Sequence, residues 1–237
     1  MNSSAFSKSD IGAQAAWKGF SSQTLYIAHR LISDKGTYEY FPEDIEDLII
    51  KKDNVIVEAV QVKNISADLS LSSLSSTRTS KGGEGFFNRM CSIHDGNSSF
   101  SCITVVYFGA LGQELQEVKD NNKETKEKLA KRLEEKHKLS AVDATWLIDS
   151  LKFEKVDLKD LAQSIEQHIC TSVAVMSAPL LAKDLLIQYI SQLSNNKGHT
   201  SFALWQEKIH NIGVSIAAID GFYKEYNKSL VCLSELQ

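Results

Sequence analysis

The sequence predicts an α/β domain that carries a C-terminal helical subdomain. Three observations support this fold class. The chain has 237 residues, of which 43% are hydrophobic, so it can bury a large core. It contains only two prolines, which leaves long helices uninterrupted. The hydrophobic period changes from helical to strand-like near residue 38 and becomes helical again after about residue 110. We expect a core domain over residues 1–157 and a helical subdomain, or a linker to a sensor or oligomerisation module, over 158–237.

The N-terminal half predicts one helix followed by a hairpin. Apolar residues recur at three- and four-residue spacing over residues 10–33, which predicts an amphipathic helix. Residues 38–50 and 55–64 are two strand-like runs joined by the polar residues 51–54, a pattern typical of a β-hairpin. Residues 55–62 are rich in β-branched side chains, so we expect this strand to lie centrally in its sheet.

After the hairpin, the sequence predicts further strands and helices in alternation, and then a helical C-terminal region. Residues 66–80 hold seven serines and continue into a glycine-rich stretch, a pattern that fits either a helix start or a mobile loop. Residues 100–110 predict a strand, 123–138 a charged helix with a solvated face, and 151–156 a short edge strand. Three apolar stripes then predict helices that begin near residues 158, 181 and 212.

Composition excludes several classes of protein. The formal net charge is −4, from 26 basic and 30 acidic residues, so the chain is not a polybasic nucleic-acid binder. The start of the chain has no basic segment followed by an apolar run, and no stretch of about 18 apolar residues occurs. The four cysteines are widely spaced. We therefore expect a cytoplasmic protein with free thiols and no membrane partner.

The hairpin carries the residues that are suited to catalysis. Alternation along a strand predicts that Val57, Ala59, Gln61 and Lys63 share one face, beside the acidic residues 43–47 on the partner strand. A carboxylate from Asp47 and the amide oxygen of Gln61 are ligands that suit Mg²⁺, while Lys63 is suited to activating water and stabilising a charged transition state. The other interpretation is an ordinary buried salt bridge between Lys63 and a carboxylate, and spacing alone leaves both open.

Three segments resemble a known nuclease family. AQAAWKGFSSQTLYIAHRL, EDIEDLII and VEAVQVKN resemble the restriction-endonuclease-like (PD-D/ExK) superfamily, in particular the nuclease domain of CBASS phage-defence effectors, which also occurs at the N-terminus of some antiviral STAND NTPases. The match covers about residues 11–65. It includes a "GFxxQ"-like stretch at residues 19–23 and a strand that ends in Gln61-Val62-Lys63. The resemblance implies a restriction-endonuclease-like core, with a central mixed sheet flanked by helices.

The resemblance also implies roles for individual residues. It places Asp47 as a metal ligand, Gln61 in the position where the family usually has Glu or Asp, and Lys63 as the catalytic lysine. Glu43 is a candidate further ligand, and Gln23 occupies a place where relatives often have a helix-borne Glu. Gln61 removes one negative charge from the site, and the chain has no "PD" dipeptide because Pro42 precedes Glu43.

Three other groups of residues are weaker candidates for a functional site. Arg78, Lys81 and Arg89 form a basic group around the glycine-rich loop that fits either contact with a DNA backbone or a mobile polar loop. That loop lacks the Gly-Lys-Ser/Thr ending of a Walker motif, so no NTPase module is expected in this chain. A zinc site at Cys91, His94 and Cys102 lacks a fourth ligand at a sensible spacing.

Together these features predict a Mg²⁺- or Mn²⁺-dependent DNA endonuclease that serves as an effector domain in bacterial anti-phage defence. By analogy with the family, we expect activation by homo-oligomerisation, through a sensor or STAND ATPase module in the same polypeptide or complex. The alternative is a binding or scaffolding module with the same fold and a catalytically silent site.

Overall fold

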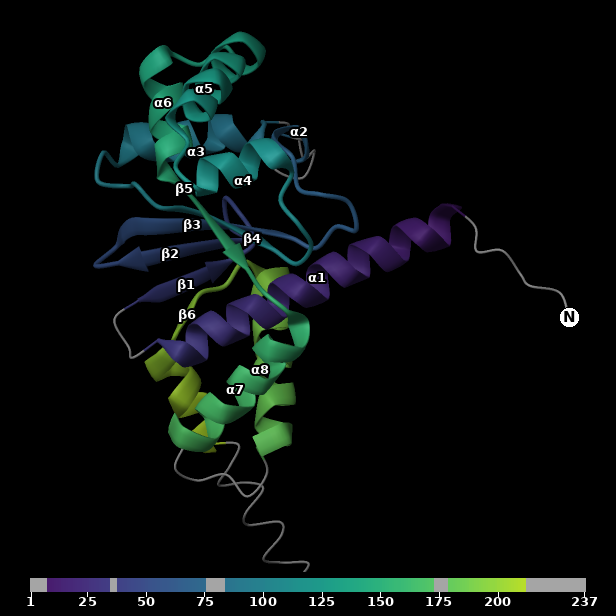
Figure 1. The fold of residues 1–237 in the computed structure, drawn as a ribbon. Coiled ribbons are helices and arrows are strands. Elements are labelled where there is room, and N and C mark those ends of the chain that lie inside the picture. Colours follow the sequence, from purple (N-terminus) through teal and green to yellow (C-terminus); the bar gives the residue numbers. More distant parts are fainter. Residues whose placement is uncertain (1–7, 35–37, 76–83, 173–178, 212–237) are drawn as a thin grey trace, which may run out of the picture.

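A six-stranded mixed sheet organises the chain in the computed structural model, which describes residues 8–34, 38–75, 84–172 and 179–211. The sheet has the order β5-β4-β3-β2-β1-β6 (Figure 1). The first three strands form an antiparallel meander, β4 and β5 continue the sheet in parallel with β3, and β6 pairs antiparallel with β1. The strands are β1 Glu39–Pro42, β2 Leu48–Lys52, β3 Val55–Lys63, β4 Ile103–Tyr107, β5 Leu151–Lys155 and β6 Thr200–Ser201. The α/β fold class expected from the sequence is confirmed.

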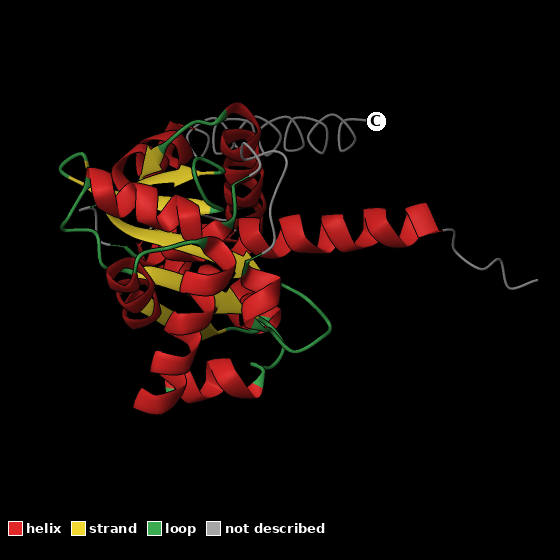
Figure 2. Cartoon of the chain, turned by 90° about the horizontal axis from the view of Figure 1, so that it is seen from above, coloured by secondary structure: helices red, strands yellow, loops and turns green. Residues whose placement is uncertain are grey.

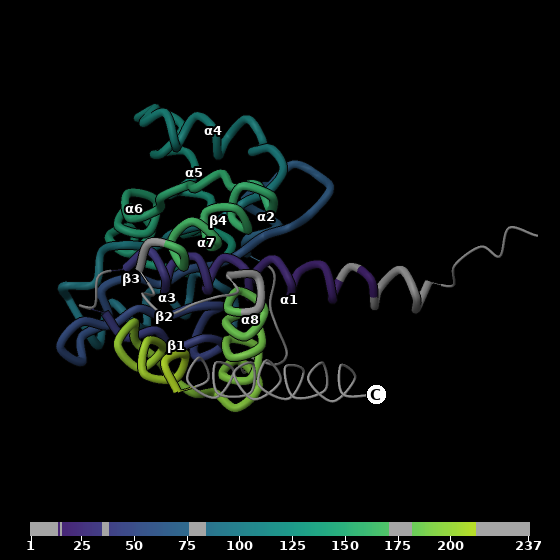
Figure 3. The backbone as a smooth tube through the Cα atoms, turned by 90° about the horizontal axis from the view of Figure 1, so that it is seen from below, coloured from purple at the N-terminus to yellow at the C-terminus, as the bar shows by residue number. Residues whose placement is uncertain are grey.

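Helices cover both faces of the sheet (Figure 1). The lower face in Figure 1 packs against α1 Lys8–Ser33, α7 Leu158–Ser172 and α8 Pro179–Asn196, which also contact one another, as the view from below in Figure 3 shows. The upper group consists of α2 Leu71–Leu74, α3 Phe86–Gly96, α4 Gln113–Lys119, α5 Lys123–His137 and α6 Ala141–Ser150. The N-terminal half of α1 extends beyond the sheet (Figure 2). None of the helices in the described ranges is long and apolar enough to cross a bilayer.

Each face of the sheet has its own hydrophobic core. The upper core joins Ala59 and Val105 of the sheet to Phe86 and Phe87 of α3. The lower core joins Val60, Val62 and Val106 to α1, α7 and α8. Because β3 contributes buried residues to both cores, the expectation that it is a central strand is confirmed.

The segment expected to form one strand over residues 38–50 forms two. β1 ends at Pro42, which has no N–H to donate to the ladder. Glu43 has a positive φ of 53°, and the chain turns through residues 43–47 before β2 begins at Leu48. The acidic residues therefore lie on a turn, and not on an extended partner strand. We call residues 43–47 the acidic turn.

A β-bulge changes the expected faces of β3. Ile50 pairs with Glu58, but Lys51 pairs with Ile56, so Val57 is the extra residue. Val57 packs against the lower core and Ile56 against the upper core. Val57 is thus not on the same face as Ala59, as strict alternation predicted, because the bulge shifts the period by one residue.

The helices after residue 157 do not form a separate subdomain within the described part of the chain. Leu161, Ile165 and Leu186 are buried in the same core as Val60 of β3. Strand β6 also adds residues from this region to the sheet. The predicted division at residue 157 is corrected: α7 and α8 bury their apolar stripes against α1 and the sheet. The third predicted stripe, from residue 212, lies outside the described residues.

Other local expectations are confirmed. The charged stretch forms helix α5, and residues 151–155 form the edge strand β5. Part of the serine-rich stretch forms the short helix α2, which begins with a capping box between Ser70 and Ser73. The hairpin between β2 and β3 turns through Asp53 and Asn54, both with positive φ, a conformation that Asp and Asn adopt more readily than most residues.

Candidate functional site

The acidic turn meets the carboxyl end of β3 at Asp47. Asp47 is fully buried, and its Oδ2 accepts hydrogen bonds from the backbone N–H of Val62, at 2.8 Å, and from the side-chain amide of Gln61. Gln61 itself is 1% exposed. The structure therefore brings together the two residues that the sequence predicted as metal ligands, which stand fourteen positions apart in the chain.

Helix α1 contributes Gln23 to the same place. Its Nε2 donates to Glu43 Oε1 at 2.6 Å and to the backbone carbonyl of Asp47 at 3.2 Å. The backbone N–H of Glu43 also donates to this carbonyl, at 3.1 Å. Gln23 thus fixes both ends of the acidic turn, and Glu43 lies next to Asp47 because of the turn and not because of an extended strand.

Lys63 is the last residue of β3 and is half-buried. It lies two residues beyond Gln61, so the pleat of the strand places both side chains on the upper face. Asp47 and Gln61 are in direct contact at this strand end, and Lys63 follows two residues later on β3.

The four acids of the turn have different environments. Asp44 is exposed, whereas Glu46 is fully buried and accepts a 2.6 Å hydrogen bond from Arg89 Nε. Arg89 is itself 5% exposed and donates through Nη1 to the carbonyl of Glu84 at 2.5 Å. The expectation that Arg89 contacts DNA is therefore corrected, because burial in an ion pair withdraws its guanidinium from the surface. Arg78 and Lys81 lie outside the described residues.

Sequence reasoning missed a second contact between α1 and the end of β3. The Ser22 side chain is fully buried, and its Oγ accepts a 2.5 Å hydrogen bond from Asn64 Nδ2. Ser22 and Asn64 are the direct neighbours of Gln23 and Lys63 in the chain, which is the signal that could have identified them. This contact helps to fix the helix against the strand that carries Lys63.

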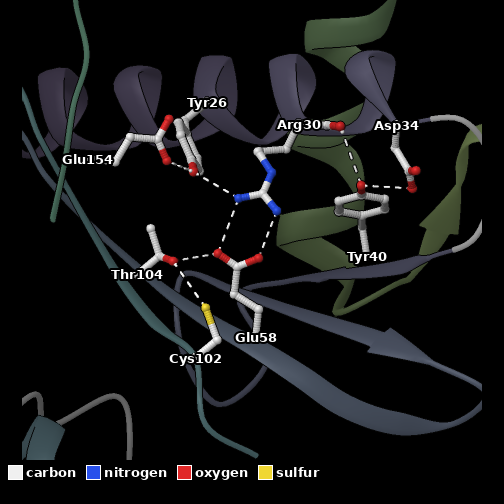
Figure 4. A network of polar contacts seen from close by, with 8 residues as sticks. All are labelled: Tyr26, Arg30, Asp34, Tyr40, Glu58, Cys102, Thr104 and Glu154. Carbon is white, nitrogen blue, oxygen red and sulfur yellow. Dashed lines mark hydrogen bonds and ion pairs between the residues drawn. The ribbon is translucent and has the colours of Figure 1, made fainter. Parts of the chain in front are cut away.

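A larger polar network joins α1 to the middle of the sheet (Figure 4). Arg30 binds Glu58 through two hydrogen bonds of 2.7 and 3.2 Å, and Thr104 donates to the same carboxylate. Arg30 also donates to the Tyr26 hydroxyl, which donates to Glu154 at 2.7 Å. Residues 23, 26 and 30 follow helical spacing, so they share the face of α1 that lies on the sheet.

Burial and charge shift the titration of this network. Burial raises the pKa of Tyr26 far above its usual range, and the charge of Glu154 acts in the same direction. Burial opposes the charged form of Arg30, but the hydrogen bonds and charges of Glu58 and Tyr26 outweigh it and raise the pKa of Arg30. The network thus holds a charged guanidinium and a neutral phenol at neutral pH, which is suited to anchoring the helix.

The donor set near Asp47 suits a hard cation. Carboxylate oxygens from Asp47 and Glu43 and the amide oxygen of Gln61 are ligand types that Mg²⁺ prefers. No group of three or more His, Cys, Asp or Glu side chains in the described ranges is arranged to hold a metal, so an amide or backbone oxygen would have to complete the set. His94 of the zinc alternative stacks on Trp146 with ring centroids 3.9 Å apart, and its Nδ1 lies 3.2 Å from the carbonyl oxygen of Phe100.

A cavity of about 550 Å³ lies between the β2–β3 hairpin and α3. Its lining includes Lys51, Ile56, Arg89 and Asn97, and it reaches the acidic turn only through Ile45. The candidate catalytic residues therefore lie at the strand end and not in this cavity.

The protein is an α/β domain, and buried polar side chains gather at the carboxyl end of its central strand β3. No protein-family model and no curated protein matches this sequence. Among solved structures, the chain is similar to the Acinetobacter baumannii Cap4 SAVED/CARF-domain containing receptor with the cyclic trinucleotide 2'3'3'-cAAA, with a TM-score of 0.50 and 12% identity over 81% of this chain and 44% of that chain.

Two further similarities have lower scores. The Moraxella osloensis Cap4 SAVED/CARF-domain containing receptor gives a TM-score of 0.45 at 14% identity, over 78% of this chain and 44% of the other. The Acinetobacter baumannii receptor with 3'3'3'-cAAA gives 0.46 at 12% identity, over 86% and 45%. The chain thus spans less than half the length of these proteins, and at these identities the similarity concerns the fold.

Proposed function

We propose that the chain is a Mg²⁺- or Mn²⁺-dependent DNA endonuclease domain of a cytoplasmic bacterial anti-phage defence system, and that oligomerisation activates it. The observation that carries this proposal is the convergence of Asp47, Gln61 and Lys63 at the end of β3. The family resemblance supports it, since helix α1 with Gln23, the acidic turn and a strand that ends in Gln61-Val62-Lys63 follow one another along the chain as the resemblance implies. The fold shared with a Cap4 receptor supports the link to defence.

The residues of the strand end divide the chemical work. Asp47, Gln61 and Glu43 would hold the metal ion, which supplies polarisation of the phosphate and a lowered pKa for its bound water. The Lys63 ammonium would orient the attacking water and stabilise the negative charge that develops on the phosphoryl oxygens. Gln23 holds the acidic turn in position through its two hydrogen bonds. The buried Asp47 keeps its orientation because the Val62 N–H fixes one carboxylate oxygen.

The net charge of the chain and its number of candidate active sites both support the proposed activation by oligomerisation. Cleavage of both strands of a duplex needs two active sites, and the chain offers one candidate. A net charge of −4 also gives little non-specific attraction to DNA. Joining copies raises the effective concentration of weak contacts, so a dimer should bind and cleave far better than a monomer. Since the chain spans 44% of the length of a similar Cap4 receptor, a sensor or STAND ATPase module in the same polypeptide or complex is a suitable partner.

The test is cleavage of a supercoiled plasmid by the chain as a monomer and as a fusion to a dimerising domain, with Mg²⁺, with Mn²⁺ and with EDTA. We expect linear product only from the dimer and only with a divalent ion. The Lys52→Ala dimer is the matched control, because Lys52 is an exposed lysine at the opposite end of the β2–β3 pair. Strong double-strand cleavage by a dilute monomer would contradict activation by assembly, and cleavage in EDTA would contradict the metal requirement.

One observation favours a second candidate function, a silent scaffolding module. The Gln61 amide donates directly to the carboxylate of Asp47, so this carboxylate is satisfied without a metal ion. A dimer that binds DNA but leaves plasmid intact with every divalent ion would select this alternative.

A further inference from the structure

Three parallel strands end together beside the candidate site. The register places Lys63 of β3 opposite Tyr107 of β4, and Tyr107 opposite Lys155 of β5. Residues in register on parallel strands point to the same face, and neighbouring strands lie about 4.8 Å apart. Lys63 and Lys155 therefore flank Tyr107 on the upper face of the sheet, about 10 Å apart at their backbones.

Helix α4 adds a third lysine to this group. Lys119 is the last residue of α4, and its Nζ donates to the Tyr107 hydroxyl at 3.1 Å. Tyr107 is 4% exposed, whereas Lys119 and Lys155 are exposed. The buried ring thus supports a line of three lysines along the carboxyl edge of the sheet. We call Lys63, Lys119 and Lys155 the strand-end lysines.

The charges of Lys119 and Lys155 are available to a ligand. Within the described residues, neither side chain forms an ion pair. The acids next to them in the chain are held by other groups. Asp120 accepts from the Gln116 amide at 3.0 Å, and Asp157 accepts from the backbone N–H of Lys159 at 2.7 Å.

The geometry points to the strand-end lysines as the site that binds the phosphodiester backbone of the substrate beside the cleaved bond. This inference rests on the proposed nuclease function and names the surface that the substrate follows. Lysine binds phosphate as a point charge, and ligands of open α/β sheets bind at the carboxyl ends of parallel strands. The line begins at the candidate catalytic Lys63, so a bound strand would run from there across β4 and β5. This proposed contact of the strand-end lysines takes the place of the DNA contact that the sequence suggested for Arg89.

The test separates binding from cleavage. A short fluorescently labelled duplex is titrated with the dimer fusion carrying Asp47→Asn, to prevent cleavage, and fluorescence anisotropy is measured across a series of KCl concentrations. Lys119→Ala and Lys155→Ala are introduced into this background, with Lys52→Ala as the control. Each test variant should weaken binding and reduce the slope of log K against log salt by about 1, the effect of one lost phosphate contact. The control should leave both unchanged.

Affinities and slopes for Lys119→Ala and Lys155→Ala that equal those of Lys52→Ala would overturn the inference, and so would absence of duplex binding at low salt. Failure here is distinguishable from failure of the proposed function, because plasmid cleavage by the wild-type dimer is scored separately. If the wild type cleaves and both lysine variants bind normally, the nuclease remains and the strand-end lysines do not hold its substrate.

Discussion

Helix α1 makes two polar attachments that use different chemistry, one to the acidic turn and one to strand β3. Near the carboxyl end of β3, the neutral amide of Gln23 holds the acidic turn. Nearer its amino end, the guanidinium of Arg30 binds Glu58 through two hydrogen bonds (Figure 4). A bidentate bond between two charged groups is stronger and more directional than a single bond from a neutral amide to a carboxylate. The Arg30 end is therefore suited to holding the fold, and the Gln23 end to a site whose carboxylates must accept a ligand.

Removing the candidate catalytic side chains near Gln23 should have the largest effect on cleavage. In the dimer fusion, Lys63→Ala and Asp47→Asn should each lower plasmid cleavage by about 100-fold or more, because each removes a group required for the chemistry. Lys63→Ala should change the free energy of unfolding by only about 1 kcal/mol, since the side chain is half-buried at a strand end. A Lys63→Ala variant with a strongly reduced Tm and normal cleavage would show that the lysine is structural.

Breaking the Arg30 end should instead reduce stability. Arg30→Met leaves the Glu58 carboxylate, which is 14% exposed, without its guanidinium and should cost about 2–4 kcal/mol in urea unfolding. The control is Arg132→Met, which breaks the more exposed pair with Glu114 and should cost less than about 1 kcal/mol. Equal losses in the two variants would remove the distinction between the two ends of α1.

Gln61→Glu sharpens the comparison at the candidate site. This change adds a negative charge beside Asp47 and Glu43, so the dimer should reach half-maximal cleavage at about tenfold lower Mg²⁺. The measurement is the cleavage rate across a Mg²⁺ titration, with circular dichroism as a check on folding. A folded, dimeric Gln61→Glu protein that is inactive at every Mg²⁺ concentration would argue against Gln61 as a metal ligand.

The smallest effect concerns the pH dependence of the α1–α7 contact. Burial, with the nearby His168, lowers the pKa of His29 below its ordinary value of 6.5, and Ser164 lies 3.1 Å from its Nε2. Below pH 6.5 the unfolded chain therefore binds more protons at this position than the folded chain, so stability should fall as the pH decreases from 6.5 toward the folded pKa.

The check is Tm measured from neutral pH down to about pH 5.5, in the wild type and in His29→Gln. The remaining groups that face His29 are Arg30 and Ser33 of α1 and Glu154 of β5. His29→Gln should flatten the decline. An identical decline in both proteins would assign the pH dependence to other groups, such as His137, whose pKa is also lowered by burial.

The sequence predicted the elements whose signal is local. The β-branched runs of β3 and β4 and the charged pattern of α5 each lie within one short segment and are typical of one secondary structure. The spacing of Gln61 and Lys63 also needed only the pleat of a strand. The resemblance made Gln23 and Asp47 candidate residues because the segments that carry it include both of them.

Tertiary structure decided which charged side chains are exposed and which are buried. Four neighbouring acids look alike in the sequence, yet Glu46 is paired with Arg89 and Asp47 accepts from Val62 and Gln61. The alignment of Lys63, Tyr107 and Lys155 depends on the registers of three strands, and each of these residues is more than forty positions from the next in the chain. A local sequence pattern predicts the periodicity of side chains along a helix or strand. The partner that each side chain contacts depends on long-range packing. The spacing of Gln61 and Lys63 on β3 could therefore be predicted from the sequence, whereas the acidic turn and the surface that surrounds these residues could not.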